Sequence, residues 1–179
     1  MVQHSDLVTE TSEARLAAQV DALAQACEAA KLQIAAAESC TGGWLAKLCT
    51  DRAGSSAWFE RGMVVYSNAA KTELAGVPAA LIQAHGAVSS PVAEALVNGL
   101  LARTPADLAV GITGIAGPSG GTSEKPVGLV WIAWQQRGMS ALVREFRFKG
   151  ERGAVRAQAV SAGLQGLLAL ASGEAPDVG

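Results

Sequence analysis

The order of hydrophobic and polar positions along the chain changes between a helical and a strand-like period. An amphipathic helix is predicted near the N-terminus, where one face carries Leu16, Val20, Leu23 and Cys27. Residues 32–37 and 108–112 are short and continuously apolar, which is typical of strands buried on both faces. Each of these two runs leads directly into a glycine-containing turn.

Strand and helix signals also alternate in the middle of the chain. The stretch 58–66 is rich in β-forming residues, and the Ser-Asn pair after it can cap a helix that begins at Ala69. Ser90 precedes a proline and has the form of an N-cap with proline at the first helical position. This helix is predicted to end near Arg103.

The C-terminal part predicts a β-hairpin and a closing helix. Residues 127–134 and 141–148 have the composition of two strands joined by a short turn, and residues 151–171 have helical periodicity. Because helices and strands interleave and the early strands are continuously apolar, we predict a three-layer α/β/α sandwich around a mixed sheet.

Length and composition fit one domain with a substantial core, since half of the 179 residues are hydrophobic. We predict that the domain spans residues 13–171, with disordered ends at 1–12 and 172–179. The start of the chain is polar and acidic and does not resemble a secretory signal. No apolar run is long enough to span a bilayer, so we expect a cytoplasmic protein without a membrane partner.

Charge and cysteine usage narrow the classes of ligand. A net charge of −2 gives no overall attraction to nucleic acid or to an anionic membrane, so any nucleotide must be held by a local site. The three cysteines form no Cys-x-x-Cys pair, and the chain has only two histidines. We therefore expect no disulfide framework, no metal site and no cofactor.

The turn at residues 38–43, Glu-Ser-Cys-Thr-Gly-Gly, is the first candidate site. Ser39 follows a predicted strand and precedes a predicted helix, where backbone N–H groups favour a phosphate or a developing oxyanion. Gly42 and Gly43 can take positive φ and let the backbone approach a ligand closely. Taken alone, the turn fits a functional nucleophile and a plain helix cap about equally.

The second candidate site is residues 113–121, Thr-Gly-Ile-Ala-Gly-Pro-Ser-Gly-Gly, which also follow a predicted buried strand. Ligands of open α/β sheets gather beyond the carboxyl ends of the strands, so the two loops fit the walls of one cleft. A flexible surface loop is the alternative interpretation.

Few side chains can act as a base for Ser39. His4 lies in the predicted disordered end, and His85 precedes a glycine at the predicted end of a helix, where a capping role is ordinary. Lys71 and Tyr66, the single tyrosine, flank a strand-to-helix junction. A buried lysine has a lowered pKa, and Ser-Lys dyads are a known way of activating a serine. Taken individually, a solvated lysine and a packed tyrosine are the ordinary interpretations.

Read together, these segments resemble the CinA C-terminal-domain family, whose stand-alone members are nicotinamide-nucleotide amidases. The matching stretches occur in the family's order and span residues 13–171: AAESCTGG, GSSAWFERGMVVYSNAAK, GAVSS, ADLAVGITGIAGPSGG and KPVGLVWIA. The resemblance implies hydrolysis of the carboxamide of nicotinamide mononucleotide to nicotinic acid mononucleotide and ammonia. It also implies a homodimer or a larger homo-oligomer, with apolar contact area at Trp58, Phe59 or the terminal helices.

The resemblance further assigns roles to individual residues. Ser39 is expected to be the nucleophile, with Tyr66 and Lys71 activating it. The expected substrate contacts include the turn at residues 38–43, called the serine turn below, whose backbone N–H groups are expected to hold the oxyanion. They also include a serine of the Gly-Ser-Ser segment, the loop at residues 113–121, and an arginine at the start of the last helix. In this chain these residues are Cys40, Thr41, Gly42, Gly43, Ser56 (or Ser55), Thr113, Gly114, Gly117, Arg152 and Arg156, and the sequence does not decide between the two arginines.

Three alternatives stay open at this point. Cys40 adjoins Ser39 at a helix start, where a thiolate nucleophile would be favoured. A second alternative is a non-catalytic nucleotide-binding or competence-related regulatory module, because a fold does not determine a function. A third alternative is an amidase for another pyridine or ribonucleotide amide.

Overall fold

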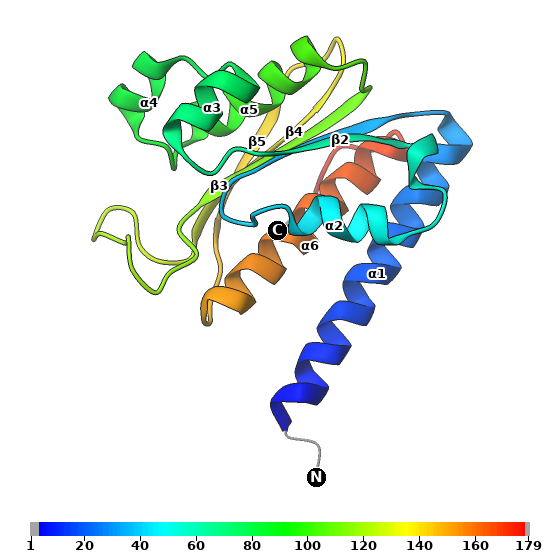
Figure 1. Cartoon of the computed structure of the whole chain (residues 1–179), viewed down its shortest axis with the longest axis horizontal. Coiled ribbons are helices and arrows are strands. Elements are labelled where there is room, and N and C mark those ends of the chain that lie inside the picture. The colour runs from blue at the N-terminus through cyan, green and yellow to red at the C-terminus, as the bar shows by residue number, and fades with distance from the viewer. Residues whose placement is uncertain (1–3, 178–179) are drawn as a thin grey trace.

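The computed structural model describes residues 4–177, with side chains from residue 13 onward. Six α-helices, one short 3₁₀ helix and five strands are present in this part of the chain (Figure 1). Their order is α1 (His4–Ala30), β1 (Ile34–Glu38), α2 (Trp44–Asp51), η1 (Ser55–Ala57), β2 (Phe59–Val64), α3 (Asn68–Ala75), α4 (Ala79–His85), α5 (Ser90–Arg103), β3 (Leu108–Gly114), β4 (Leu129–Gln136), β5 (Leu142–Arg147) and α6 (Arg152–Ala171).

The strands form one sheet in the order β2-β1-β3-β4-β5. Strand β1 runs parallel to both β2 and β3, whereas β4 is antiparallel to β3 and to β5. The predicted mixed sheet and the predicted hairpin of β4 and β5 are therefore confirmed.

Helices cover both faces of the sheet, as the three-layer prediction requires. Helices α1, α2 and α6 lie on one face, and α3, α4 and α5 lie on the other (Figure 1). Strand β1 is buried on both sides because its side chains alternate between two hydrophobic clusters. Ile34 and Ala36 belong to the cluster under α1 and α6, and Ala35 and Ala37 belong to the cluster under α5.

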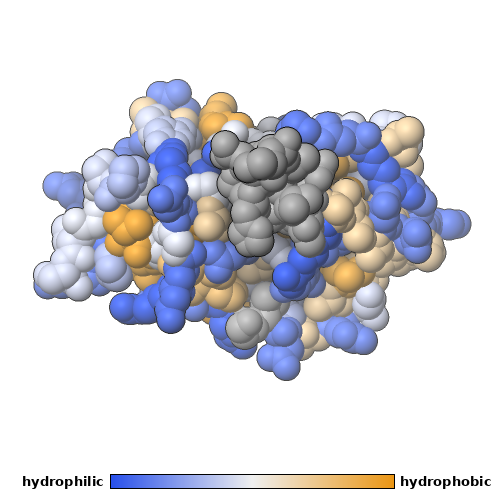
Figure 2. All heavy atoms as spheres, turned by 90° about the horizontal axis from the view of Figure 1, so that it is seen from below, coloured by the Kyte–Doolittle hydropathy of each residue, from blue (hydrophilic) through white to orange (hydrophobic). Residues whose placement is uncertain are grey.

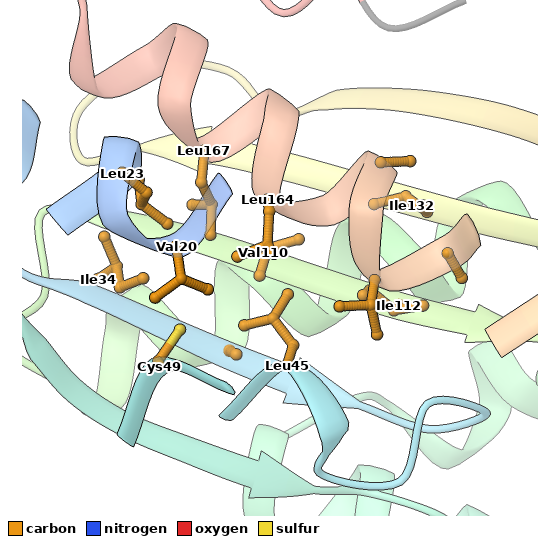
Figure 3. Packing of buried hydrophobic residues seen from close by; sticks show 14 of the residues in the cluster. Val20, Leu23, Ile34, Leu45, Cys49, Val110, Ile112, Ile132, Leu164 and Leu167 are labelled. Carbon is orange, nitrogen blue, oxygen red and sulfur yellow. The ribbon is translucent and has the colours of Figure 1, made fainter. Parts of the chain in front are cut away.

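The larger of these clusters joins the terminal helices to the sheet. In Figure 3, Leu164 of α6 lies over the side chain of Val110 on β3, and Leu23 of α1 lies beside Leu167 of α6 in the same cluster. Burying such aliphatic side chains contributes roughly 1.5–3 kcal/mol each. The first and last helices thus hold β1 and β3, whose carboxyl ends carry the two candidate loops.

A close contact brings α3 against α5 on the other face. A Cβ atom added to Gly99 of α5 would lie 1.6 Å from the carbonyl oxygen of Ala75, so only glycine fits at this crossing. This contact fixes the end of α3, the helix that carries Lys71.

The structure differs from the sequence predictions at several places. Helix α1 extends back to His4, because no glycine or proline interrupts the segment before residue 13. At the C-terminus, a hydrogen bond from the Glu174 N–H to the Ala169 carbonyl closes a turn after α6, and Pro176 is buried. The remaining parts of the two predicted disordered ends, residues 1–3 and 178–179, lie outside the described residues.

Two further expectations need correction. The N-cap of α5 is Ser89, not Ser90, and its hydroxyl donates to the Gly86 carbonyl instead of capping the helix. Trp58 is fully buried in the core, so it offers no apolar area to a second copy. On the face seen in Figure 2, hydrophobic residues occur in small groups between hydrophilic ones. The homo-oligomer stays a prediction.

Candidate active site

Three strand-to-helix or strand-to-loop junctions meet at one edge of the sheet. Ser39 follows the last residue of β1, Thr113 is near the end of the neighbouring strand β3, and α3 begins shortly after β2. Since these three strands are parallel, their carboxyl ends share this edge. Residues far apart in the sequence are therefore brought to one place.

Lys71 reaches the serine from the first turn of α3. Its side chain is buried, with 1% exposure, and its Nζ lies 3.0 Å from the Ser39 Oγ. The same amine donates to the carbonyls of Val65, at 2.9 Å, and Tyr66, at 3.1 Å. The predicted pair of a serine and a lysine is thus present, with both side chains held inside the protein.

The surroundings of Lys71 favour its neutral form. Burial lowers the pKa of the Lys71 amine below its ordinary value, and no carboxylate forms a salt bridge with it in the described chain. A neutral amine has two N–H donors and one lone pair. The amine has three oxygen neighbours, the Val65 carbonyl, the Tyr66 carbonyl and the Ser39 Oγ. In the neutral form, two N–H donors suffice for the carbonyls, and the lone pair can accept the proton of the Ser39 hydroxyl.

Tyr66 contributes differently from the sequence expectation. Its carbonyl oxygen orients Lys71, while its side chain is 62% exposed at the border of the cavity. Lys71 contacts Ser39 directly, so the geometry needs no proton relay through the phenol.

Glu38 is a buried residue to which the sequence reasoning assigned no role. Its carboxylate, at 1% exposure, accepts hydrogen bonds from the N–H groups of Leu45 at 3.1 Å and Ala46 at 2.8 Å. The N-cap position of α2 is Gly43, which has no side chain to satisfy these donors. Glu38 therefore caps α2 from the preceding strand and fixes the turn that contains Ser39.

Replacing Glu38 with alanine is expected to destabilise the protein by about 2–4 kcal/mol. This estimate combines a lost helix cap, typically about 1 kcal/mol, with the burial of unpaired N–H groups, about 1–3 kcal/mol. Urea unfolding measures the change. Glu60→Ala is the control, because Glu60 pairs only with its exposed neighbour Arg61 and should shift stability by less than about 0.5 kcal/mol. Equal midpoints for the two variants would contradict the capping role.

The serine turn offers few free backbone donors. Gly42 and Gly43 have φ of 63° and 87°, as predicted, and the Gly42 N–H bonds to the Ser39 carbonyl. With Glu38 capping α2, the N–H groups of Cys40, Thr41 and Gly43 are left without a backbone acceptor in the described chain. Cys40 also lines the cavity, so its N–H is the best-placed donor for an oxyanion.

A cavity of about 240 Å³ opens over the Ser39 hydroxyl. It contains eight of the predicted site residues: Ser39, Cys40, Tyr66, Lys71, Thr113, Gly114, Gly117 and Arg152. Ile115, Ala116, Ser119 and Gly120 of the predicted loop 113–121 complete one wall, and the sequence reasoning missed three lining residues: Asn68, Ala87 and Val88. The pair Ala87 and Val88 could have been found from the Gly-Ala-Val-Ser-Ser segment, which the family resemblance includes.

The two candidate arginines have different places. Arg152 lines the cavity and donates to the Gly117 carbonyl at 2.8 Å. Arg156 points to the serine turn from behind, where it donates to the Thr41 carbonyl at 2.6 Å and lies 5.3 Å from the centre of the Trp44 ring. Arg156, Thr41, Gly42 and Gly43 therefore shape the turn and do not line the cavity.

Ser56 lies outside this site within the chain. It is exposed in the 3₁₀ helix η1, immediately before β2 begins. Ile34 pairs with Phe59 and Glu38 pairs with Val64, so the start of β2 is at the opposite end of the sheet from Ser39. Neither Ser56 nor its neighbour Ser55 lines the cavity of a single chain, and their expected place near the substrate stays a prediction.

Cys40 is poorly suited to act as the nucleophile. Burial raises the pKa of its thiol to about 11, and no lysine or histidine hydrogen-bonds to it in the described residues. The thiolate is therefore not the resting form at neutral pH. Ser39 is the better candidate because its hydroxyl faces a base.

The sequence profile described as the CinA C-terminal domain matches residues 16–171. The chain belongs to the CinA C-terminal domain family. Two relatives are similar along most of their length, and both are named nicotinamide-nucleotide amidohydrolase PncC. The protein of Escherichia coli K12 is 52% identical over 143 residues, covering 80% of this chain and 87% of the relative. The protein of Pseudomonas putida is 51% identical over 138 residues, covering 77% of this chain and 86% of the relative.

A solved structure supports the same family assignment. The competence/damage inducible protein CihA of Agrobacterium tumefaciens has a TM-score of 0.84 and 40% identity, covering 87% of this chain and 94% of that one. The CinA domain described here contains, between residues 4 and 177, no helix with the length and hydrophobicity needed to cross a membrane. The same residues include no cluster of three or more potential metal-binding side chains.

Proposed function

We propose that this CinA domain hydrolyses the carboxamide of nicotinamide mononucleotide, releasing nicotinic acid mononucleotide and ammonia. The observation that carries the proposal is the buried Lys71 amine, 3.0 Å from the Ser39 hydroxyl, at the bottom of a cavity. The choice of substrate is supported by the names of relatives that are about half identical to the chain. The expected product places the enzyme among intracellular pyridine-nucleotide reactions.

In the proposed mechanism, Lys71 takes the proton of Ser39 as the Oγ attacks the amide carbon. The new C–O bond gives a tetrahedral oxyanion, which the N–H of Cys40 stabilises. The C–N bond then breaks, and the Lys71 ammonium returns its proton to the leaving nitrogen, which departs as ammonia. A water molecule, deprotonated by Lys71, attacks the acyl-enzyme, and the released Ser39 oxygen regains the proton.

The direct test is ammonia release by the purified protein, with nicotinamide mononucleotide, nicotinamide riboside and free nicotinamide compared in parallel. We expect turnover of the mononucleotide with a higher kcat/KM than for the other two amides. Preference for the riboside or for free nicotinamide would assign a different amide substrate. Tight binding of the mononucleotide without ammonia release would reject catalysis and favour a nucleotide-binding module.

The phosphate of the substrate is expected to interact with Arg152. Arg152→Ala should raise the KM for the mononucleotide by about 10- to 100-fold, because charge-assisted hydrogen bonds are worth about 1.5–3 kcal/mol. The KM for the riboside should change much less. Steady-state kinetics with both substrates measure the difference. Arg156→Ala is the comparison, since Arg156 braces the turn and its loss should affect both substrates alike. An equal loss for both substrates in Arg152→Ala would contradict a phosphate contact.

A further inference from the structure

The loop between β3 and β4 forms one wall of the cavity and has few backbone ties to the rest of the protein. Gly117, Ser119 and Gly120 of this loop line the cavity. Two backbone hydrogen bonds close the base of the loop: the Ile115 N–H donates to the Leu129 carbonyl, and the Gly128 N–H donates to the Ile115 carbonyl. Further out, the Thr122 N–H bonds to the Lys125 carbonyl, which ties the loop only to itself. The Arg152 side chain ties Gly117 to α6, but no hydrogen bond joins residues 119–122 to another element in the described structure.

Lys125 supplies a contact with the opposite wall. Its Nζ donates to the carbonyl of His85 at 2.7 Å and to the carbonyl of Val88 at 2.9 Å. These carbonyls belong to the connection between α4 and α5, where Ala87 and Val88 line the cavity. The side chain of Lys125 therefore bridges the two walls, although it does not itself line the cavity.

The neighbouring residues accommodate this bridge. Gly86, which follows the first acceptor residue, has φ of 75°, and an added Cβ would lie 2.9 Å from the Lys125 Nζ. A glycine therefore gives the ammonium room to reach both carbonyls. Nearer the sheet, the Thr113 hydroxyl donates to the Ala87 carbonyl at 2.8 Å, so the same connection is tied to β3 as well.

We propose that Lys125 is a positioning residue that fixes the width of the substrate cavity. This inference rests on the proposed amidase function, because its effect is expected on substrate binding. An ammonium that donates to two carbonyls makes strong, directional contacts. Such a bridge holds both walls in the binding geometry before the substrate arrives, so less ordering is required on binding. The chemistry at Ser39 does not involve Lys125.

The test compares Lys125→Met, Lys125→Arg and Lys47→Met with the unaltered protein. Methionine keeps much of the length of the side chain but loses the hydrogen bonds. We expect Lys125→Met to raise the KM for nicotinamide mononucleotide about tenfold and to change kcat by less than about threefold, the pattern of lost uniform binding. Lys125→Arg should restore most of the affinity. Lys47 lies on the surface in an ion pair with Asp51, so Lys47→Met should leave both constants unchanged.

Hydrogen exchange without ligand provides a second measurement that does not depend on activity. The N–H groups of Thr122 and Gly128, which donate to the carbonyls of Lys125 and Ile115, should exchange faster in Lys125→Met than in the unaltered protein or in Lys47→Met. Unchanged exchange, an unchanged KM accompanied only by a lower Tm, or a selective loss of kcat would each overturn the proposal. Absence of ammonia release by the unaltered protein would reject the amidase function instead, and the exchange comparison would then decide whether the bridge exists.

Discussion

Ser39→Ala is expected to lower kcat for nicotinamide mononucleotide by about 10⁴- to 10⁶-fold, the range found when a nucleophile that acts with a base is removed. The variant should fold normally, because alanine removes only one oxygen whose partner in the described structure is the Lys71 amine. Single-turnover ammonia release measures the loss. Ser172→Ala, which changes an exposed serine after α6, is the control and should keep full activity. Substantial ammonia release by Ser39→Ala would exclude Ser39 as the nucleophile.

Lys71→Met is expected to cause a loss similar to that in Ser39→Ala, and the double variant should be little worse than either single one. Residues that act as one catalytic unit show this strong non-additivity. Lys71→Arg should also be inactive, because an arginine stays protonated and cannot accept the serine proton. If Lys71→Arg retained much of the activity, a base at this position would be ruled out.

The lowered pKa of Lys71 also fixes the direction of two pH effects. In the proposed mechanism the neutral amine is the active form, so kcat/KM should increase as pH rises through the pKa of Lys71 in the free enzyme. Between that lowered pKa and the ordinary lysine value of 10.5, the unfolded state binds more protons than the folded state. The free energy of unfolding should therefore increase with pH over the same window, and Lys71→Met should lack this increase.

The parts of the fold that depend on local pattern were predictable from the sequence. Strands β1 and β3 are continuously apolar over most of their length, and the absence of a usable histidine pointed to Lys71 as the base. The cap that Glu38 provides could not be predicted, because it depends on how α2 turns back toward the end of β1. The sequence likewise gave no register for β1 and β2, and this register places Ser56 at the far end of the sheet.

The choice between Arg152 and Arg156 shows the same limit at one helix. The two residues are four positions apart and so lie on one side of α6, one turn from each other. Only the position of α6 along the sheet decides that the first reaches the cavity and the second reaches the back of the serine turn. The position of a helix along the sheet arises from tertiary packing, and the helical periodicity of the sequence does not predict it.

The carboxylate of Glu38 has a consequence for how a substrate must enter. It neutralises the positive end of α2, so the serine turn attracts an anionic phosphate less than an uncapped helix start would. Two cationic side chains line the cavity, Lys71 and Arg152. Lys71 is buried, whereas Arg152, at the start of α6, is exposed to solvent. For the proposed substrate, this arrangement of charge favours an orientation with the uncharged amide directed inward to Ser39 and the anionic phosphate directed outward to Arg152.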